Sequence, residues 1–242
     1  MPSVIAIDWS GRETGAAESI WLAHVVDGEL VRLANGSGRR AVIAHALELA
    51  GDHQQTVIGL DFAFSFPCWY VEELGWSSGR EVWAAMRDEA EDLLRGCQPP
   101  FWGRAGRRRP ADVEMHRRTE MALPFQPKSV RGMEHLATLA EADCSIWPFD
   151  PPGWPRVVEI YPRLLTGKVH KSRHRERLGH LEEHFAALPE PWRERAAGSE
   201  DAFDAAVSAL RMANGTDALV CLERADEDSP ELLEGEIWIP PA

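Results

Sequence analysis

Short apolar runs separated by polar, turn-forming residues occupy the first sixty positions, and this pattern is typical of β-strands. The predicted strands are residues 4–8, 18–26, 29–33 and 56–61. Asp27-Gly28, between the second and third runs, is a strong hairpin signal. The chain is therefore expected to begin with three antiparallel strands that follow one another in the sheet.

Helical spacing of apolar residues appears between the third and fourth strands, over residues 39–50. A connection through a helix lets the fourth strand lie parallel to the first and beside it. Residues 156–159 form a further predicted strand, and residues 175–188 and 199–213 are predicted helices. The expected fold is α/β, with a mixed five-stranded sheet flanked by helices.

The composition of the chain changes between residues 67 and 155. This segment contains six of the ten tryptophans and many prolines, with helices predicted at residues 80–95 and 133–143 and an irregular loop at 98–110. It is too long for a simple connection between two strands. We interpret it as an inserted Trp/Pro-rich cap between two parts of one core domain, residues 1–66 and 156–242.

Acidic residues end three of the predicted strands, namely Asp8, Asp61 and Glu159. Neighbouring parallel strands lie about 4.8 Å apart and end at the same sheet edge, so Asp8 and Asp61 are expected side by side. The alternative for Asp8 is a turn-forming role, which is common for Asp. On the predicted helix 199–213, Asp201 and Asp204 share a flank beside the apolar stripe and can point at the same edge.

Four or five carboxylates at one place repel one another unless cations neutralise them. Oxygen ligands suit Mg²⁺ or Mn²⁺, and two such ions about 4 Å apart catalyse in-line hydrolysis of phosphodiesters. The catalytic candidates are Asp8, Asp61, Glu159 and Asp204, with Asp201 as an additional metal ligand. Candidate contacts to a phosphodiester substrate are Ser10, Ser65, Trp102, Arg107, Tyr161, Lys168 and Lys171.

The distribution of charge along the chain indicates whether it can bind nucleic acid. The chain carries a formal charge of -13, but residues 101–135 contain eight Lys/Arg against four Asp/Glu, and residues 163–177 contain six against one. These basic segments allow local contact with nucleic acid although the remaining surface repels it. No apolar run is long enough to span a membrane, and we expect a cytoplasmic protein without membrane contact.

Four motifs resemble one known family when they are taken in order: Ile7-Asp-Trp-Ser-Gly11, Asp61-Phe-Ala-Phe-Ser-Phe-Pro67, Glu159-Ile-Tyr-Pro162 and Glu200-Asp-Ala-Phe-Asp-Ala205. They are similar to the domain-of-unknown-function 429 family, described as predicted nucleases of the ribonuclease H-like superfamily. The resemblance covers most of the chain outside the cap and implies an acidic centre of Asp8, Asp61, Glu159 and Asp204. The acidic surface and the long cap depart from the open basic groove of that superfamily, which argues against long duplex substrates.

Two other functions fit the same residues. Actin-like phosphotransferases use a similar core with an Asp on the first strand, but they need glycine-rich phosphate loops, and here only Gly11 follows Asp8 closely. A non-catalytic module that binds nucleic acid or protein through the cap is the third alternative. The pairs His170/His174 and His180/His184 have the helical spacing of zinc ligands, but no third ligand accompanies either pair in the sequence.

Overall fold

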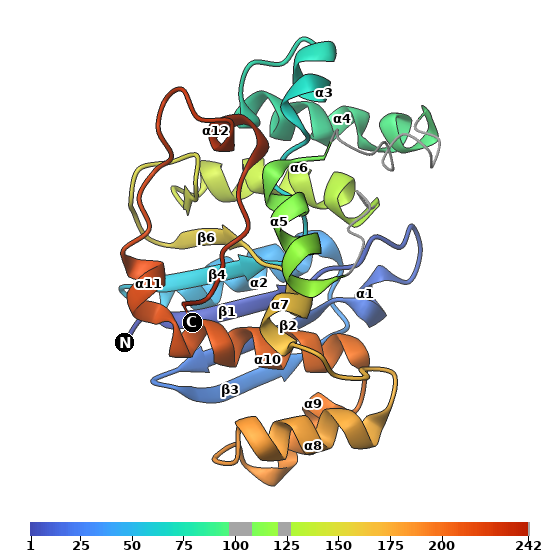
Figure 1. Cartoon of the computed structure of the whole chain (residues 1–242), viewed down its shortest axis with the longest axis vertical. Helices are drawn as coiled ribbons and strands as arrows, with labels where there is room; N and C mark the ends of the chain where they lie inside the picture. The colour runs from blue at the N-terminus through green and yellow to red at the C-terminus, as the bar shows by residue number, and fades with distance from the viewer. Residues whose placement is uncertain (97–107, 121–126, 242) are drawn as a thin grey trace.

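A mixed six-stranded sheet forms the centre of the computed structural model, which describes residues 1–96, 108–120 and 127–241 (Figure 1). The spatial order is β3-β2-β1-β4-β6-β5. Strands β1, β2 and β3 are antiparallel, whereas β4, β6 and β5 run parallel to β1. Their bounds are β1 (Ser3–Asp8), β2 (Trp21–Val26), β3 (Glu29–Ala34), β4 (Thr56–Leu60), β5 (Ser145–Ile146) and β6 (Arg156–Glu159).

This order is that of the ribonuclease H-like fold, and it confirms the predicted α/β class. The additional sixth strand, β5, is only two residues long, which is too short to leave a periodic signal in the sequence. The predicted strand at residues 18–26 begins at Trp21, because the residues before it form the short helix α1.

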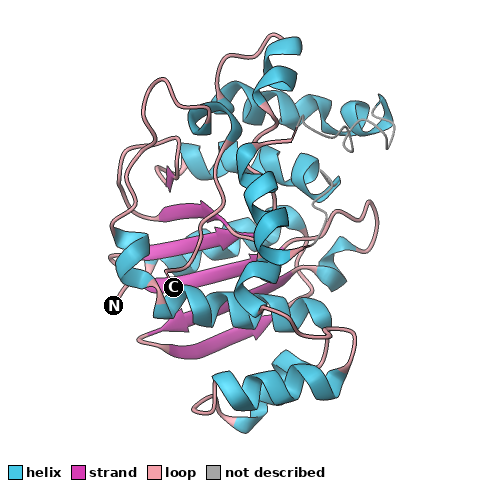
Figure 2. Cartoon of the chain, viewed as in Figure 1, coloured by secondary structure: helices cyan, strands magenta, loops and turns pink. Residues whose placement is uncertain are grey.

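Helices cover both faces of the sheet (Figure 2). Helix α10 packs on β1, β2 and β3 from one side. Helices α2 and α6 lie on the other side, where they share a hydrophobic cluster with β1 and β4. The helices are α1 (Ala16–Ser19), α2 (Arg39–Gly51), α3 (Cys68–Glu73), α4 (Gly79–Gly96), α5 (Pro110–Thr119), α6 (Pro127–Glu141), α7 (Pro162–Thr166), α8 (His174–His184), α9 (Glu190–Ala197), α10 (Glu200–Asn214), α11 (Thr216–Val220) and α12 (Glu231–Glu234).

Strand β1 is buried on both faces, which explains its continuous apolar sequence. Ile5 and Ile7 belong to the hydrophobic cluster below α2 and α6, whereas Val4 and Ala6 belong to the cluster below α10. Successive side chains of a strand point to opposite faces. Asp8 therefore lies on the α10 face, two positions beyond Ala6.

Helix α10 approaches the sheet closely. Its first turn is capped by Ser199, whose Oγ accepts a hydrogen bond from the Ala202 backbone N at 3.0 Å. The sheet-facing side includes small residues such as Ala205 and Ala206. On the sheet, Gly59 of β4 leaves room for Met212 of the helix, since a Cβ added at Gly59 would lie 2.6 Å from Met212 Sδ. Small residues on both surfaces thus let the helix pack closely on the sheet.

Helix α6 comes from the predicted cap, yet it packs directly on the sheet core. Val130, Met133 and Leu136 are fully buried in the same cluster as β1 and β4. A Cβ at Gly132 would lie 2.5 Å from the ring of Phe62. At least one helix of residues 67–155 therefore contributes to the core, while the division of the chain into a core and a cap stays a prediction.

Within the described ranges, no helix has both the length and the apolar character needed to cross a membrane.

Two mid-helix glycines provide a test of the packing of α6. Gly132→Ala should lower the free energy of unfolding by about 1–3 kcal/mol, because the new methyl group overlaps the Phe62 ring. Gly179→Ala on α8, where nothing lies within 4 Å of the added Cβ, should instead raise it by about 0.5–1 kcal/mol. Urea denaturation measures both. Equal stabilisation by the two substitutions would show that α6 does not pack on Phe62 in this way.

Candidate active site

Asp8 and Asp61 are neighbours at the carboxyl ends of β1 and β4. The parallel register pairs Ile7 with Leu60, and the Asp61 backbone N donates to the Ile7 carbonyl at 3.1 Å. Both side chains are nearly buried, with 8% and 5% of the residue surface exposed. The prediction that the strand order brings these two acids together is confirmed by the pairing.

Helix α10 adds Asp204, and Asp201 lies one turn before it. The pKa of Asp8 is raised well above its usual range by burial and by the charges of Asp61, Asp204 and, more weakly, Asp201. Burial and the charge of Asp61 also raise the pKa of Asp204, to about 6, although Lys171 and Lys128 oppose this rise. Four carboxyl groups thus share one electrostatic environment.

Two lysines partly neutralise this group. Lys171 Nζ lies 2.5 Å from Asp204 Oδ2, and Lys128 Nζ lies 2.7 Å from Asp61 Oδ2. Burial opposes the charge on Lys128, but Asp61 and Asp8 outweigh this effect and raise the pKa of the lysine. Lys171 was among the sequence candidates, whereas Lys128 was not.

The first turn of α6 places Lys128 between the loops that follow β1 and β4. A Cβ at Gly11 would lie 2.5 Å from the Lys128 backbone N, so only glycine allows this approach. Arg131 donates to the Gly11 carbonyl, and the Ala63 backbone N donates to Ser129 Oγ at 3.0 Å. These contacts position the lysine beside the two aspartates.

Glu159 lies apart from the aspartates, because successive side chains of a strand point to opposite faces of the sheet. Its partner in the register is Leu60, so it points to the face opposite Asp61. There its two oxygens accept hydrogen bonds from Arg109, at 2.7 Å for Oε1 and 2.9 Å for Oε2, and Oε2 also accepts one from the Phe64 backbone N at 2.9 Å. The structure thus gives Glu159 a buried ion pair with the segment that begins α5.

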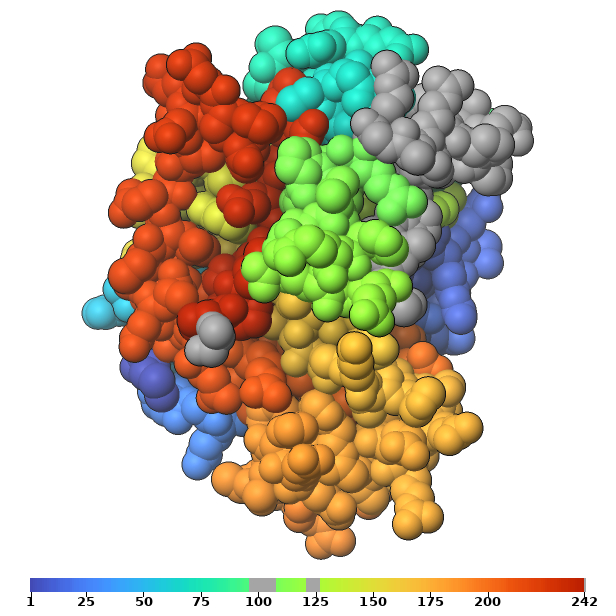
Figure 3. Space-filling view, in the orientation of Figure 1, coloured from blue at the N-terminus to red at the C-terminus, as the bar shows by residue number. Residues whose placement is uncertain are grey.

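Arg109 also contacts the end of the chain. Its guanidinium bonds Asp112 on α5 and donates to the Glu234 carbonyl at 3.0 Å. In the space-filling view, α5 in green lies against the C-terminal segment in red (Figure 3). The hydrogen bonds of Arg109 therefore join α5, β6 and the C-terminal segment. The arginine is only 1% exposed, so this junction is buried.

The remaining sequence candidates occupy different environments. Tyr161 is half-buried, and burial raises the pKa of its hydroxyl, with a further contribution from Asp61, so it lies near the aspartates. Ser10 is buried on the loop after β1, and its Oγ accepts from the Arg12 backbone N at 3.3 Å. Ser65 is fully buried, and its hydroxyl has no hydrogen-bond partner among the described residues.

Lys168 is largely exposed, and its Nζ lies 3.8 Å from Oε2 of the exposed Glu120. Trp102 and Arg107 lie outside the described residues.

The donor chemistry of the aspartates fits a divalent cation that prefers oxygen ligands. Asp204 Oδ1 is buried without a hydrogen-bond partner, and the mutual repulsion at Asp8 would be relieved by a positive ion. However, no three His, Cys, Asp or Glu side chains of the described ranges are already arranged as a metal-binding group. Each lysine contacts one oxygen of its aspartate, Oδ2 of Asp61 for Lys128 and Oδ2 of Asp204 for Lys171.

Comparisons of the chain with protein-family models, curated proteins and solved structures gave no match. The class of the protein therefore rests on the order of its strands, and its activity must be inferred from the site itself.

Asp8→Asn should stabilise the metal-free protein at neutral and higher pH. The raised pKa of Asp8 means that its neutral form favours folding, and this contribution is lost as pH rises through the raised pKa. The variant should match the parent near about pH 4 and exceed it by about 1–3 kcal/mol at about pH 8. Thermal and urea denaturation with a chelator present measure the difference. Asp228→Asn, at an exposed position, is the control, and its stability should change little. If Asp8→Asn were less stable than the parent at both pH values, Asp8 would not lie in the buried, negatively charged surroundings that raise its pKa.

Glu159→Gln should destabilise the protein by roughly 3 kcal/mol, because it leaves the buried Arg109 guanidinium without one of its charged partners. The loss should appear in denaturation experiments without any metal. Glu114→Gln, which removes surface pairings with Arg117 and Arg118, should have little effect. If Glu159→Gln kept full stability and instead lost metal affinity, the ion pair would not be its main role.

Proposed function

We propose that this chain is a divalent-metal-dependent phosphodiesterase, and specifically a nuclease. The observation that carries the proposal is the shared environment of Asp8, Asp61 and Asp204, where acids from two strands and one helix are buried together and the pKa values of Asp8 and Asp204 are raised. A cluster of buried carboxylates lowers the stability of the fold unless a cation binds it. Clusters of this kind, with raised pKa values, are typical of functional sites. The four-motif resemblance to the domain-of-unknown-function 429 family supports the same activity.

Asp8, Asp61 and Asp204 would hold Mg²⁺ or Mn²⁺, with Asp201 at the more exposed side of the group. When bound, two such ions can lower the pKa of a water molecule and stabilise the oxygens of a phosphodiester. Asp8 and Asp61 are positioned by adjacent strand ends, so the separation of their backbones is set by the sheet. Rigid elements of this kind keep ligands in place better than loops do.

The lysines have a separate role in this proposal. Lys128 and Lys171 neutralise aspartates while no cation is bound, and each has a primary amine that can turn toward a phosphate oxygen when the cation takes its place. Tyr161, which is near enough for the charge of Asp61 to raise the pKa of its hydroxyl, is a further polar contact for the substrate. The basic stretch 163–177 lies next in the chain, so the contact with nucleic acid is proposed on this side.

Because the body of the protein is acidic, a short, structured or single-stranded nucleic acid fits better than a long duplex. A long duplex would bring many phosphates against negative surface.

A cleavage screen tests the proposal. The parent protein should cut at least one substrate among single-stranded, duplex and branched DNA and RNA when Mg²⁺ or Mn²⁺ is present, and a chelator should stop it. Asp8→Asn should lower the rate about a hundredfold or more, equivalent to about 3 kcal/mol of transition-state stabilisation. Asp228→Asn should retain the parent rate.

The folding of Asp8→Asn is checked by its denaturation curve, so a loss of cleavage is not mistaken for unfolding. Undiminished cleavage by the variant would overturn the role of Asp8. Nucleotide binding without strand cleavage would favour a phosphotransferase, and metal-independent binding without turnover would favour a binding module.

A further inference from the structure

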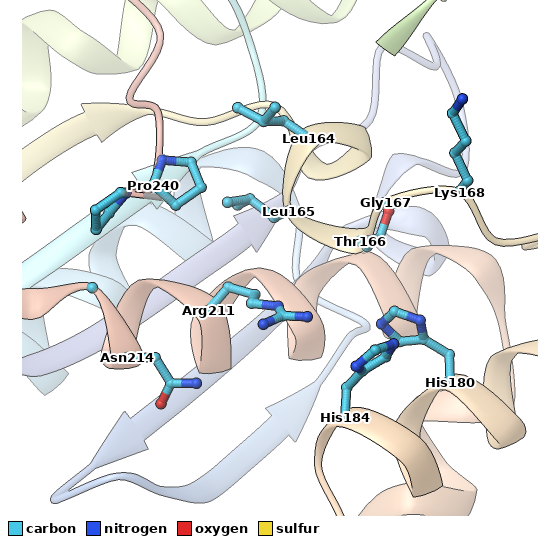
Figure 4. A pocket seen from close by; sticks show the side chains of 12 residues that line it. Leu164, Leu165, Thr166, Gly167, Lys168, His180, His184, Arg211, Asn214 and Pro240 are labelled. Atoms are coloured by element: carbon cyan, nitrogen blue, oxygen red, sulfur yellow. The ribbon is translucent and has the colours of Figure 1, made fainter. Parts of the chain in front are cut away.

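A separate cavity of about 390 Å³ lies between α7, α8, α10 and the C-terminal segment (Figure 4). Its lining includes Leu164, Thr166, His180, His184, Arg211 and Pro240. This volume is within the range of small-molecule sites, about 300–1,000 Å³.

Cationic and hydrogen-bonding groups gather on one side of the cavity. The Arg211 guanidinium is directed toward the ring pair of His180 and His184, whose centroids are 4.4 Å apart (Figure 4). Arg211 lies over the Phe185 ring, with Cζ 5.2 Å from its centroid, and its side chain has no hydrogen bond or ion pair among the described residues. Its donors are therefore available to a ligand.

Two further polar atoms at this place lack partners. His180 Nε2 and Thr166 Oγ1 are buried without a hydrogen bond in the described ranges, and Thr166 is only 1% exposed. A buried polar group without a hydrogen bond costs free energy, so a ligand that bonds these groups gains affinity. Together with Arg211, these groups offer donors from three different helices.

The charge around the cavity selects an anion. Among the described residues that line it none is acidic, and Glu183 on α8 lies outside, exposed and 3.9 Å from His184 Nε2. Burial, with the charges of His184 and Arg211, lowers the pKa of His180 to about 4. A metal ion is disfavoured, because the guanidinium faces the histidine pair. The position of Arg211 thus argues against the zinc role weighed for His180 and His184 from the sequence.

The opposite wall is apolar. Leu164, Leu165, Pro240 and Pro241 line it and offer no hydrogen-bond donor from their side chains. A ligand that fills the cavity thus has an anionic end and an organic part. A phosphate group matches three donors from different directions better than a planar carboxylate does.

We propose that this cavity binds a small organic phosphate monoester, with its phosphate on Arg211, His180 and Thr166 and its organic part against Leu164, Leu165 and Pro240. Lys168 lines the rim, but its side chain is directed away from the cavity (Figure 4). The proposal does not depend on nuclease activity. Arg211 and Asp204 are seven residues apart on α10, which corresponds to about 10 Å along the helix, so this cavity and the aspartate site are distinct places.

Binding is tested with the full chain carrying Asp8→Asn and with a chelator present, so that no metal at the aspartates binds the probes. Phenyl phosphate, inorganic phosphate, phenylacetate and phenol are titrated by calorimetry and by amide chemical shifts. Phenyl phosphate should bind most tightly and should shift the amides of Gly167 and Gly215. Arg211→Gln should weaken it about tenfold or more.

Arg32→Gln is the matched control, since Arg32 is an exposed residue of β3 outside the cavity. It should bind phenyl phosphate as the parent does. His180→Gln should also weaken binding, which keeps the test valid if Arg211→Gln folds poorly. Equal affinity for phosphate and phenyl phosphate, tighter binding of phenylacetate, or binding unaffected by Arg211→Gln and His180→Gln would each overturn the proposal.

Discussion

The burial of Asp8 beside Asp61 is the constraint on which the rest of the site depends. Two carboxylates at adjacent strand ends repel each other in a region from which water is largely excluded, and this arrangement is unfavourable unless positive charge accompanies it. The first turn of α6 supplies Lys128 to Asp61, while Lys171 pairs with Asp204. The close contact of Gly11 with α6 and the approach of α10 to the sheet both serve to bring these charges together.

Much of this arrangement could be predicted from local patterns. The hairpin signal, the helix at residues 39–50 and the apolar run ending in Asp61 were sufficient to place β4 beside β1. The flank of α10 that carries Asp201 and Asp204 follows from helical periodicity alone. These inferences succeeded because each depends on residues close together in sequence, or on the parallel pairing that a helical connection favours.

The positions of Glu159 and Lys128 could not be predicted from local sequence patterns. A strand with an acid at its end does not reveal which face the acid occupies, because this depends on the register with its neighbour, and here Glu159 is paired with Leu60. Lys128 is 67 positions from Asp61, and only the path of the chain through the preceding segment brings it there. Arg109, likewise, belongs to a basic run that reads as surface charge, although its side chain is buried.

The contact between Gly11 and the first turn of α6 has a consequence for how this protein can vary. A Cβ at position 11 would meet the backbone of Lys128, which cannot turn aside as the end of a side chain can. A larger residue there would displace the first turn of α6 and take Lys128 away from Asp61. Position 11 can therefore change only together with the pairing of the lysine and the aspartate.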